Sequence, residues 1–329
     1  MFDKLICAMV NVLIYLRHPR NIVRFRRVVG YFPNVAMPRR YNEKMLWRKV
    51  FDHNPRFVVF SDKLATKDLQ AQLCPDLKRA DILWVGKRAG DIPDGILANP
   101  VAIKANHGCG FNLLLPDGCT ADELPADRVD DWLKTAFGRR DLEWAYQPVI
   151  RELFVEELLM ARPGHPLVEL SVHAVDGDAL FIEVVVDNTG AARQKGYFRP
   201  DGTRWKAIEK QPIAGKPGAS LADDFKIPQT FREALAHARV LGTGVDYARF
   251  DFFSLGDCLY GGEITVYPGA GLTRHDHFLT YNAYLSGHWD LLKSWFLSAR
   301  QGWPTQIYAN ALRRRLTHNG TKTETGCPA

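Results

Sequence analysis

Two carboxylates in a predicted β-hairpin are the strongest candidates for a functional site in this sequence, because of their residue type and their spacing. A turn centred on Asp257 would place Asp251 directly opposite Glu263 and Arg249 opposite Thr265, with all four side chains on one face. Opposed carboxylates repel each other, and a divalent cation between them removes that repulsion. Because Mg²⁺ selects hard oxygen ligands, the hairpin predicts a magnesium site. For either carboxylate taken singly, an ordinary solvated strand residue is the competing interpretation.

A lysine at the end of an apolar strand is the second candidate. Lys104 lies in the apolar run 101–105, and the loop that follows contains Gly108 and Gly110. An ammonium group and exposed backbone amides can hold phosphate oxygens. The loop leads to another strand at 113–115 rather than to a helix, so it is not a Walker A loop. A simple glycine-containing turn is the alternative.

Three glutamates form the third candidate. Glu156 and Glu157 end an apolar strand, and Glu169 follows after a turn. Backbone groups at such a strand-to-loop passage can meet an adenine edge, and a carboxylate can accept two ribose hydroxyls. Neighbours on a strand point to opposite faces, so a surface position is the alternative for either Glu156 or Glu157.

Several function classes are disfavoured by what the sequence lacks. It contains no GxSxG, HExxH or CxxC motif, which argues against serine hydrolases, zinc proteases and zinc-binding modules. The net charge of +6 comes with no interleaving of aromatic and basic residues, so we expect no nucleic-acid partner. The six cysteines show no regular spacing, which fits a reducing cytoplasm.

An apolar segment lies near the N-terminus. Leu5 to Leu16 is apolar apart from Asn11, but it is much shorter than the roughly 20 residues that span a bilayer. No signal-peptide cleavage site precedes the arginine-rich continuation. The segment is expected to be a helix packed on the body of the protein. The alternative is an interfacial helix at the inner face of a membrane, with basic side chains touching lipid headgroups: Arg17, Arg20 and Arg24.

The predicted elements indicate an α+β fold. Ser61 can cap a helix that runs to Leu73, and Asp176-Gly177 marks a hairpin turn. Helices and hairpins interleave along the chain, unlike the alternation of a doubly wound parallel sheet. The other expected elements are helices at 126–137 and 229–241 and strands at 149–158, 167–175, 179–186, 247–254 and 259–266. The expected segments are 1–40, an N-terminal helical extension; 41–97, an N-terminal subdomain; 98–155, a small lobe; 156–290, a large lobe with the metal site; and 291–329, a C-terminal helix and tail.

Five short motifs, taken in order, resemble the ATP-grasp superfamily and in it the TupA-like branch of teichuronopeptide and polysaccharide biosynthesis. The resemblance covers about Tyr41 to Gly271. It implies an ATP-grasp fold in which two α+β lobes clasp ATP, here with an N-terminal helical extension. The motifs are YNEKMLWRKVFDHNP (41–55), SDKLATKD (61–68), IKANHGCG (103–110), VEELL (155–159) and GEITVYPGAG (262–271).

The resemblance also implies roles for single residues. Lys67 and Lys104 would approach the nucleotide phosphates, with Gly108 and Gly110 in the loop that closes over them. The other implied positions are the adenine hinge at Glu157 and Leu158, the ribose at Glu169, Mg²⁺ at Asp251 and Glu263, and the transferred phosphoryl group at Arg249. One departure is Thr265, because many ATP-grasp enzymes have asparagine there as a ligand of a second Mg²⁺.

The implied activity is ATP- and Mg²⁺-dependent joining of a carboxylate to an amine through an acyl phosphate. The expected substrate is a small molecule or glycan, with an amino acid as co-substrate, in a pocket formed around Arg193 to Arg204 and Arg274 to His277. A kinase, a glycosyltransferase of the same pathway and an inactive nucleotide-binding scaffold are the alternatives.

Overall fold

The computed structural model describes residues 1–186, 193–208, 219–274 and 279–323. Contacts divide the chain into two units. Unit 1 contains Met1–Asn54, Gly244–Asp246 and Tyr267–Ala329, and unit 2 contains Pro55–Thr243 and Tyr247–Val266. The five predicted segments are a finer division, and their boundaries stay a prediction.

The first sheet of unit 2 has four antiparallel strands in the order β1-β4-β2-β3. Its inner side packs on α7 (Ala126–Lys134) through Ile103, Val155 and Trp132, and α6 (Asp94–Leu97) closes the same core. The strands are β1 (Ile82–Gly86), β2 (Val101–Ala105), β3 (Asn112–Leu115) and β4 (Leu153–Glu157). The helix expected at 126–137 therefore ends earlier, at Lys134, and the strand expected from 149 starts only at Leu153.

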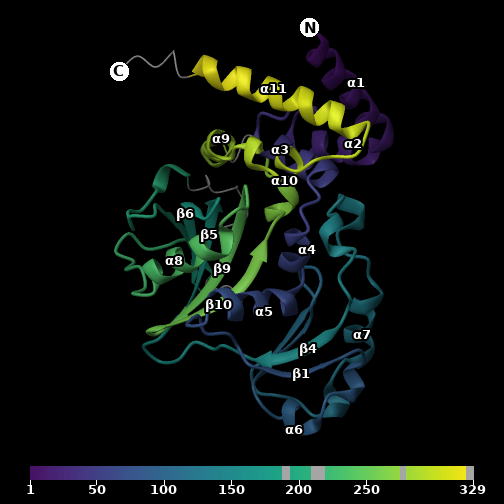
Figure 1. The fold of residues 1–329 in the computed structure, drawn as a ribbon. Helices are drawn as coiled ribbons and strands as arrows, with labels where there is room; N and C mark the ends of the chain where they lie inside the picture. Colours follow the sequence, from purple (N-terminus) through teal and green to yellow (C-terminus); the bar gives the residue numbers. More distant parts are fainter. Residues whose placement is uncertain (187–192, 209–218, 275–278, 324–329) are drawn as a thin grey trace. The chain divides into compact units, whose positions relative to one another are not determined.

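The second sheet has six strands in the order β10-β9-β5-β6-β7-β8, and all neighbours are antiparallel except β7 and β8. The helix α8 (Phe231–Gly242) covers one face of β5, β6 and β9 (Figure 1). The strands are β5 (Leu167–Val175), β6 (Asp178–Val186), β7 (Gln194–Phe198), β8 (Ala219–Ser220), β9 (Ala248–Leu255) and β10 (Cys258–Thr265).

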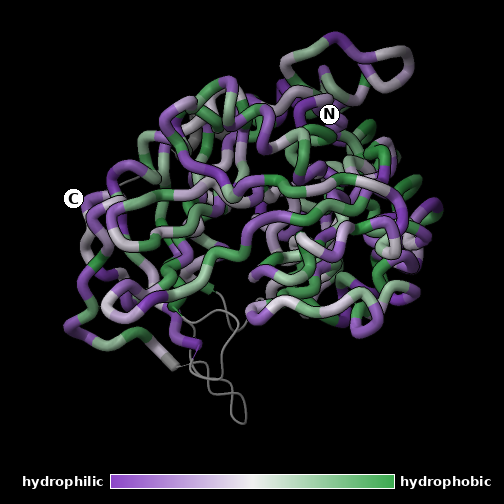
Figure 2. The backbone as a smooth tube through the Cα atoms, turned by 90° about the horizontal axis from the view of Figure 1, so that it is seen from below, coloured by the Kyte–Doolittle hydropathy of each residue, from purple (hydrophilic) through white to green (hydrophobic). Residues whose placement is uncertain are grey.

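Side-chain alternation gives the six-stranded sheet one apolar and one polar face. Phe250 packs beside the end of α8 and Phe252 lies near His237 of that helix, so even positions of β9 face α8. Arg249 and Asp251 consequently face the other side, because successive side chains on a strand point in opposite directions. Hydrophobic and hydrophilic stretches interleave along the coloured parts of the chain, as Figure 2 shows.

Two helices lie beside β10. They are α4 (Arg56–Ser61) and α5 (Lys63–Leu73), and both pack on that strand. The predicted cap at Ser61 is wrong, because Ser61 still belongs to α4. Asp62 caps α5 instead, since its carboxylate accepts hydrogen bonds from the amides of Leu64 and Ala65.

The register of the β9-β10 hairpin confirms one predicted pair and alters the other. Arg249 lies opposite Thr265, as expected. The register shifts between Gly261, which lies opposite Phe252, and Ile264, which lies opposite Phe250. A bulge in β10 therefore leaves Asp251 without a directly paired residue on that strand. The expected direct opposition of Asp251 and Glu263 is therefore wrong. The alternation of side chains in the hairpin did not predict the extra residue of the bulge. The sequence Gly261-Gly262 is compatible with a bulge, because glycine in a strand often marks one.

Unit 1 is helical and draws on both ends of the chain. In its N-terminal segment, α1 packs on α2 and on the C-terminal α11 (Figure 1). No described helix is both long and apolar enough to cross a membrane. The helices are α1 (Phe2–Arg17), α2 (Pro19–Val29), α3 (Tyr41–Phe51), α9 (Leu279–His288), α10 (Trp295–Ser298) and α11 (Thr305–Thr323).

Polar side chains are buried in the centre of unit 1. Arg48 donates a hydrogen bond of 2.8 Å to Asp246 and stacks on Trp289, whose indole donates to the other oxygen of Asp246 at 2.6 Å. Asp52 accepts the Phe296 amide at 2.8 Å. These bonds join all three chain segments of unit 1, so the motif at 41–55 serves as structural framework.

Candidate active site

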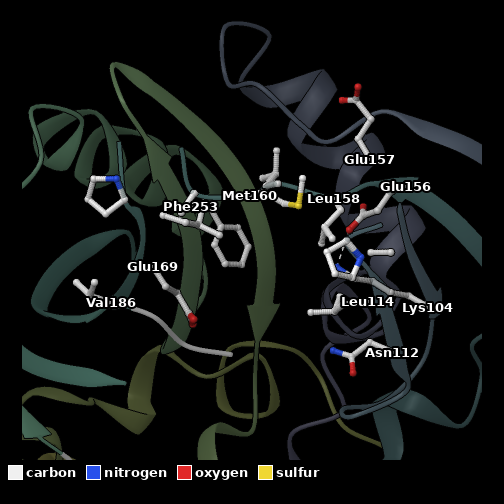
Figure 3. Close-up of a pocket in the computed structure, with 16 residues that line it drawn as sticks. Lys104, Asn112, Leu114, Glu156, Glu157, Leu158, Met160, Glu169, Val186 and Phe253 are labelled. Atoms are coloured by element: carbon white, nitrogen blue, oxygen red, sulfur yellow. Dashed lines mark hydrogen bonds and ion pairs between the residues drawn. The ribbon is translucent and has the colours of Figure 1, made fainter. Parts of the chain in front are cut away.

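A cavity of about 560 Å³ lies within unit 2, between its two sheets. This is within the usual size range of small-molecule sites. Figure 3 shows Lys104, Asn112 and Glu156 on the wall formed by the four-stranded sheet, and Glu169 and Phe253 on the opposite wall. Most of the lining is apolar, and the few charged groups are at defined places on each wall.

On the first wall, one buried carboxylate holds both predicted phosphate-binding lysines. Glu156 lies 2.8 Å from the Lys67 ammonium group and 2.5 Å from that of Lys104. Burial alone would raise the pKa of Glu156, but the two lysines outweigh that effect and lower it. The structure thus brings Lys67 and Lys104 together through Glu156, which the sequence suggested only as part of the glutamate candidate and not as a partner of the lysines. The signal was a glutamate inside the apolar run LFVEE.

The strand end that carries the predicted adenine hinge borders the same cavity. The side chain of Glu157 is exposed and points away from Glu156 (Figure 3). The amide of Glu157 donates to Asp81 at 3.0 Å, and that of Leu158 donates to Pro100 at 3.3 Å. Both amides are therefore engaged within the protein. Glu157, Leu158 and Leu159 all line the cavity, and the adenine hinge stays a prediction.

Glu169 of the second wall forms an acidic pair with Asp251, which does not itself line the cavity. The hydroxyl of Ser171 donates to Asp251 at 2.7 Å and lies 3.4 Å from Glu169. Burial raises the pKa of Glu169 to about 7, and the negative charge of Asp251 acts in the same direction. The repulsion predicted between opposed carboxylates thus exists on this face, with Glu169 rather than Glu263 as the partner of Asp251.

The positive charge of Arg249 balances the negative charge of Asp251. Its Nε and one terminal nitrogen each donate to a different oxygen of Asp251 at 2.7 Å, and Thr265 lies 3.3 Å from the same guanidinium group. Burial would lower the pKa of Arg249, yet Asp251, Glu183 and Glu169 together raise it well above its usual value. Three of the predicted residues, Arg249, Asp251 and Thr265, therefore form one hydrogen-bonded group.

An ion pair of Glu183 with Lys195 extends this face, and the sequence analysis missed it. The two residues lie on β6 and β7, and attraction between Glu183 and Arg249 links the pair to the group described above. Burial would raise the pKa of Glu183, but Lys195 and Arg249 hold it below its usual value. The available signal was a single acidic residue within the apolar strand FIEVVV.

Glu263 lies next to the glycine loop. Its carboxylate is 3.4 Å from the Lys63 ammonium group, which also donates to the carbonyl of Gly108. A small cavity of about 10 Å³ is lined by Glu263, Thr265, Lys63 and Gly108 among others. Gly108 and Gly110 both have positive φ, at 82° and 80°, and a Cβ at Gly108 would lie 2.6 Å from Phe137. The positive φ favours glycine at both positions, and the role of the loop as a backbone cradle for phosphate stays a prediction.

The predicted metal ligands fit a cation only together with an anionic ligand. No group of three or more His, Cys, Asp or Glu side chains arranged for a metal occurs among the described residues. Asp251 already accepts from Arg249 and Ser171, and Glu263 faces Lys63. Mg²⁺ commonly takes one or two carboxylates and completes its shell with substrate phosphates and water. The donor set suits that mode of binding and does not form an all-protein cage.

The predicted acceptor segments are described only in part. Arg204 lies over the Phe198 ring and donates to Ser220 at 3.0 Å, so it is tied to its own sheet. His277 and its two preceding neighbours lie outside the described residues.

Comparison with known proteins gives a family and a fold. A family model described as TupA-like ATPgrasp matches residues 43–280. Among solved structures, D-alanine–D-alanine ligase from Bacillus anthracis is similar over 82% of this chain and 70% of its own, with 14% identity and a TM-score of 0.40. The corresponding enzyme from Helicobacter pylori is similar over 70% and 61%, with 16% identity and a TM-score of 0.36.

An L-amino acid ligase from Bacillus licheniformis is similar over 69% of this chain and 48% of its own, with 14% identity and a TM-score of 0.36. No curated protein matches the sequence significantly. The family model covers well over half of the chain, including both walls of the cavity, and the mixed α+β fold with N-terminal helices is the one that the motifs predicted. The chain belongs to the TupA-like ATP-grasp family.

Proposed function

We propose that this protein is an ATP- and Mg²⁺-dependent carboxylate–amine ligase that works through an acyl phosphate. The observation that carries the proposal is the cavity of unit 2, which Lys104 and Glu156 line on one wall and Glu169 on the other. Lys67 joins the first wall through its ion pair with Glu156, and the Arg249–Asp251 group joins the second through Ser171, which hydrogen-bonds to both Asp251 and Glu169. Such a cavity can hold a nucleotide with its phosphates between two sets of charges. Membership of the ATP-grasp family supports ATP as the ligand.

Each wall has a task in this proposal. Lys67 and Lys104 bind phosphate oxygens, and Glu169 accepts the ribose hydroxyls. Asp251 and Glu263 would hold Mg²⁺, which would neutralise phosphate charge, and Thr265 would offer a weaker oxygen than an amide does. Catalysis of phosphoryl transfer rests mainly on positioning and charge stabilisation, so no protein nucleophile is needed.

The chemistry has two bond exchanges. A substrate carboxylate oxygen forms a bond to the γ-phosphorus while the bond to the β-phosphate oxygen breaks and ADP leaves. An amine then attacks the acyl carbon, phosphate leaves with its C–O bond electrons, and the amine nitrogen loses a proton. Arg249 orients the γ-phosphoryl group in both exchanges, and Lys104 stabilises the charge that develops on its oxygens.

We further propose an amino acid and a cell-surface polysaccharide or its precursor as the two substrates. This rests on the family alone. A kinase that phosphorylates the same acceptor is the second candidate, because the described contacts favour phosphoryl transfer without distinguishing the acceptor. A glycosyltransferase is less well supported, because the matching family model is of the ATP-grasp type.

An ADP-release assay tests the proposal. Purified protein is incubated with ATP, Mg²⁺, pooled amino acids and uronic-acid acceptors, and product masses are measured. The ligase releases ADP only when a carboxylate and an amine are both present, and it forms a product lighter than the two substrates by one water. A stable phosphorylated product instead supports the kinase and overturns the ligase.

Variants of both walls sharpen the assay. Lys104→Ala and Asp251→Asn are each expected to abolish turnover, by at least ~100-fold for loss of one charge-stabilising group, while circular dichroism shows the fold retained. Lys134→Ala is the matched control, because Lys134 is exposed and paired with Asp131 on α7. Full activity of either site variant contradicts the assignment.

A further inference from the structure

An exposed apolar stripe runs along the whole length of α1. Its six side chains recur every three or four residues, so they lie on one side of the helix. Each is between 57% and 74% exposed. Scattered exposed apolar residues need no explanation, but a contiguous stripe of large ones on a single helix does. The residues are Phe2, Leu5, Met9, Val12, Leu13 and Leu16.

The opposite side of α1 is anchored within unit 1. Cys7 and Ile14 are buried, and α1 packs on α11. Asn11 accepts hydrogen bonds from the amides of Val35 and Ala36 at 2.8 and 3.2 Å. The helix is therefore held in one rotation about its axis, and the stripe faces outward because of specific polar bonds rather than by chance.

The adjoining helix α2 adds a basic face. Arg20, Val23 and Arg27 are exposed on the side opposite Ile22 and Phe25, which are buried. The first 40 residues contain eight Lys and Arg against a single acidic residue, Asp3, which is paired with Arg314. Because the whole chain carries a net charge of +6, essentially all of its excess positive charge lies in these residues.

We propose that α1 and α2 dock this protein on an anionic membrane surface. The stripe of α1 enters the boundary between headgroups and acyl chains, and the basic face of α2 contacts anionic headgroups. The positive charge of this region favours a lipid surface over a second copy of the chain as its binding partner. A second copy of the chain would bring the same concentration of positive charge to the interface and repel, whereas an anionic lipid surface complements both the apolar and the basic component. No membrane-spanning helix is needed.

Vesicle co-sedimentation of the full chain tests the proposal. We expect binding to vesicles of phosphatidylcholine mixed with phosphatidylglycerol, and much weaker binding to phosphatidylcholine alone. Raising the salt concentration should weaken the binding, because screening reduces attraction between charges near the surface. Equal binding to both kinds of vesicle, or no binding to the anionic kind, overturns the proposal.

Two pairs of variants separate the components. Leu5→Ser with Leu13→Ser should weaken binding by roughly tenfold for each leucine. Arg20→Gln with Arg27→Gln should weaken it by about fivefold for each arginine. The matched controls are Val240→Ser for exposed apolar area and Arg128→Gln with Arg232→Gln for charge, all exposed positions of unit 2. Binding that the stripe variants leave unchanged contradicts the proposal.

The alternative occupant is tested on the same samples. Sedimentation velocity without lipid should give the same mass for the wild-type chain and for the Leu5→Ser, Leu13→Ser variant. A wild-type dimer that becomes monomeric in this variant would identify the stripe as a self-association surface and exclude the membrane proposal. The cavity lies in unit 2, whereas α1 and α2 belong to unit 1, so failure here leaves the proposed ligase activity intact.

Discussion

At the scale of single residues, the candidate site contains its own counter-charges. Lys67 and Lys104 are paired with Glu156, Arg249 with Asp251, and Lys63 with Glu263. Nucleotide phosphates would exchange for these carboxylates rather than meet unpaired cations. The affinity for a nucleotide then depends on how much more strongly the cations bind phosphate than their own carboxylates. Before any ligand binds, the internal ion pairs keep several buried charges satisfied.

Replacement of Glu156 tests this pairing. Glu156→Gln removes the charge that satisfies two lysines, so it should lower the free energy of unfolding by about 2–4 kcal/mol, as for other broken buried pairs. Urea unfolding followed by circular dichroism gives the value. Glu157→Gln is the control, because its exposed side chain points away from the lysines, and a change within about 0.5 kcal/mol is expected there. Equal effects in the two variants would mean that the Glu156 pairs contribute nothing to stability.

At the scale of elements, the sequence predicted most strands and helices of unit 2. The strand at 101–105, the turn at Asp176-Gly177 and the pairing of Arg249 with Thr265 are all observed. Apolar runs and turn residues carry these signals locally. The bulge beside Asp251 and the Glu183–Lys195 pair could not be predicted in the same way, because both depend on which strands become neighbours.

Gly262 allows the bulge to form. A Cβ at this position would lie 2.6 Å from the carbonyl oxygen of Asp251. Gly262→Ala should therefore separate β10 from β9 and lower the free energy of unfolding by about 1–3 kcal/mol, the usual range for overpacking. Chemical denaturation measures the loss.

The control for Gly262→Ala is Gly95→Ala in α6, where nothing lies within 4 Å of the added Cβ. There we expect a gain of up to about 1 kcal/mol, because alanine favours a helix over glycine. If Gly262→Ala leaves stability unchanged, the close approach at Asp251 is not a constraint on the hairpin.

At the scale of the whole molecule, Asp52 occupies the point where three distant segments of the chain meet. Burial raises the pKa of its carboxyl to about 7, the nearby Asp246 charge adds to the effect, and Arg48 opposes it. The unfolded chain keeps this proton only below its ordinary pKa of about 4. The native state therefore binds more protons between the two values, and the stabilising contribution of Asp52 is lost as the pH rises through about 7.

Asp52→Asn separates this effect from other titrations. Asparagine keeps a side-chain oxygen to accept the Phe296 amide, but it does not ionise. Between pH 5 and pH 8, wild-type stability should fall relative to the variant, by on the order of 2–4 kcal/mol for a shift of this size. Urea unfolding at the two pH values gives the difference. A constant difference between wild type and variant would show that Asp52 does not titrate in this range.

The three-segment composition of unit 1 also determines when each part can fold during synthesis. Most of unit 2 is one nearly continuous stretch, so it can fold as soon as Val266 has left the ribosome. The first 54 residues cannot, because Arg48 and Asp52 need Trp289 and Phe296 as partners. Until those residues arrive, both the inner side of α1 and its apolar stripe are exposed on the nascent chain. Residues 1–54 therefore reach their native packing only after their partners beyond residue 266 are made, and contacts of such long sequence separation form slowly.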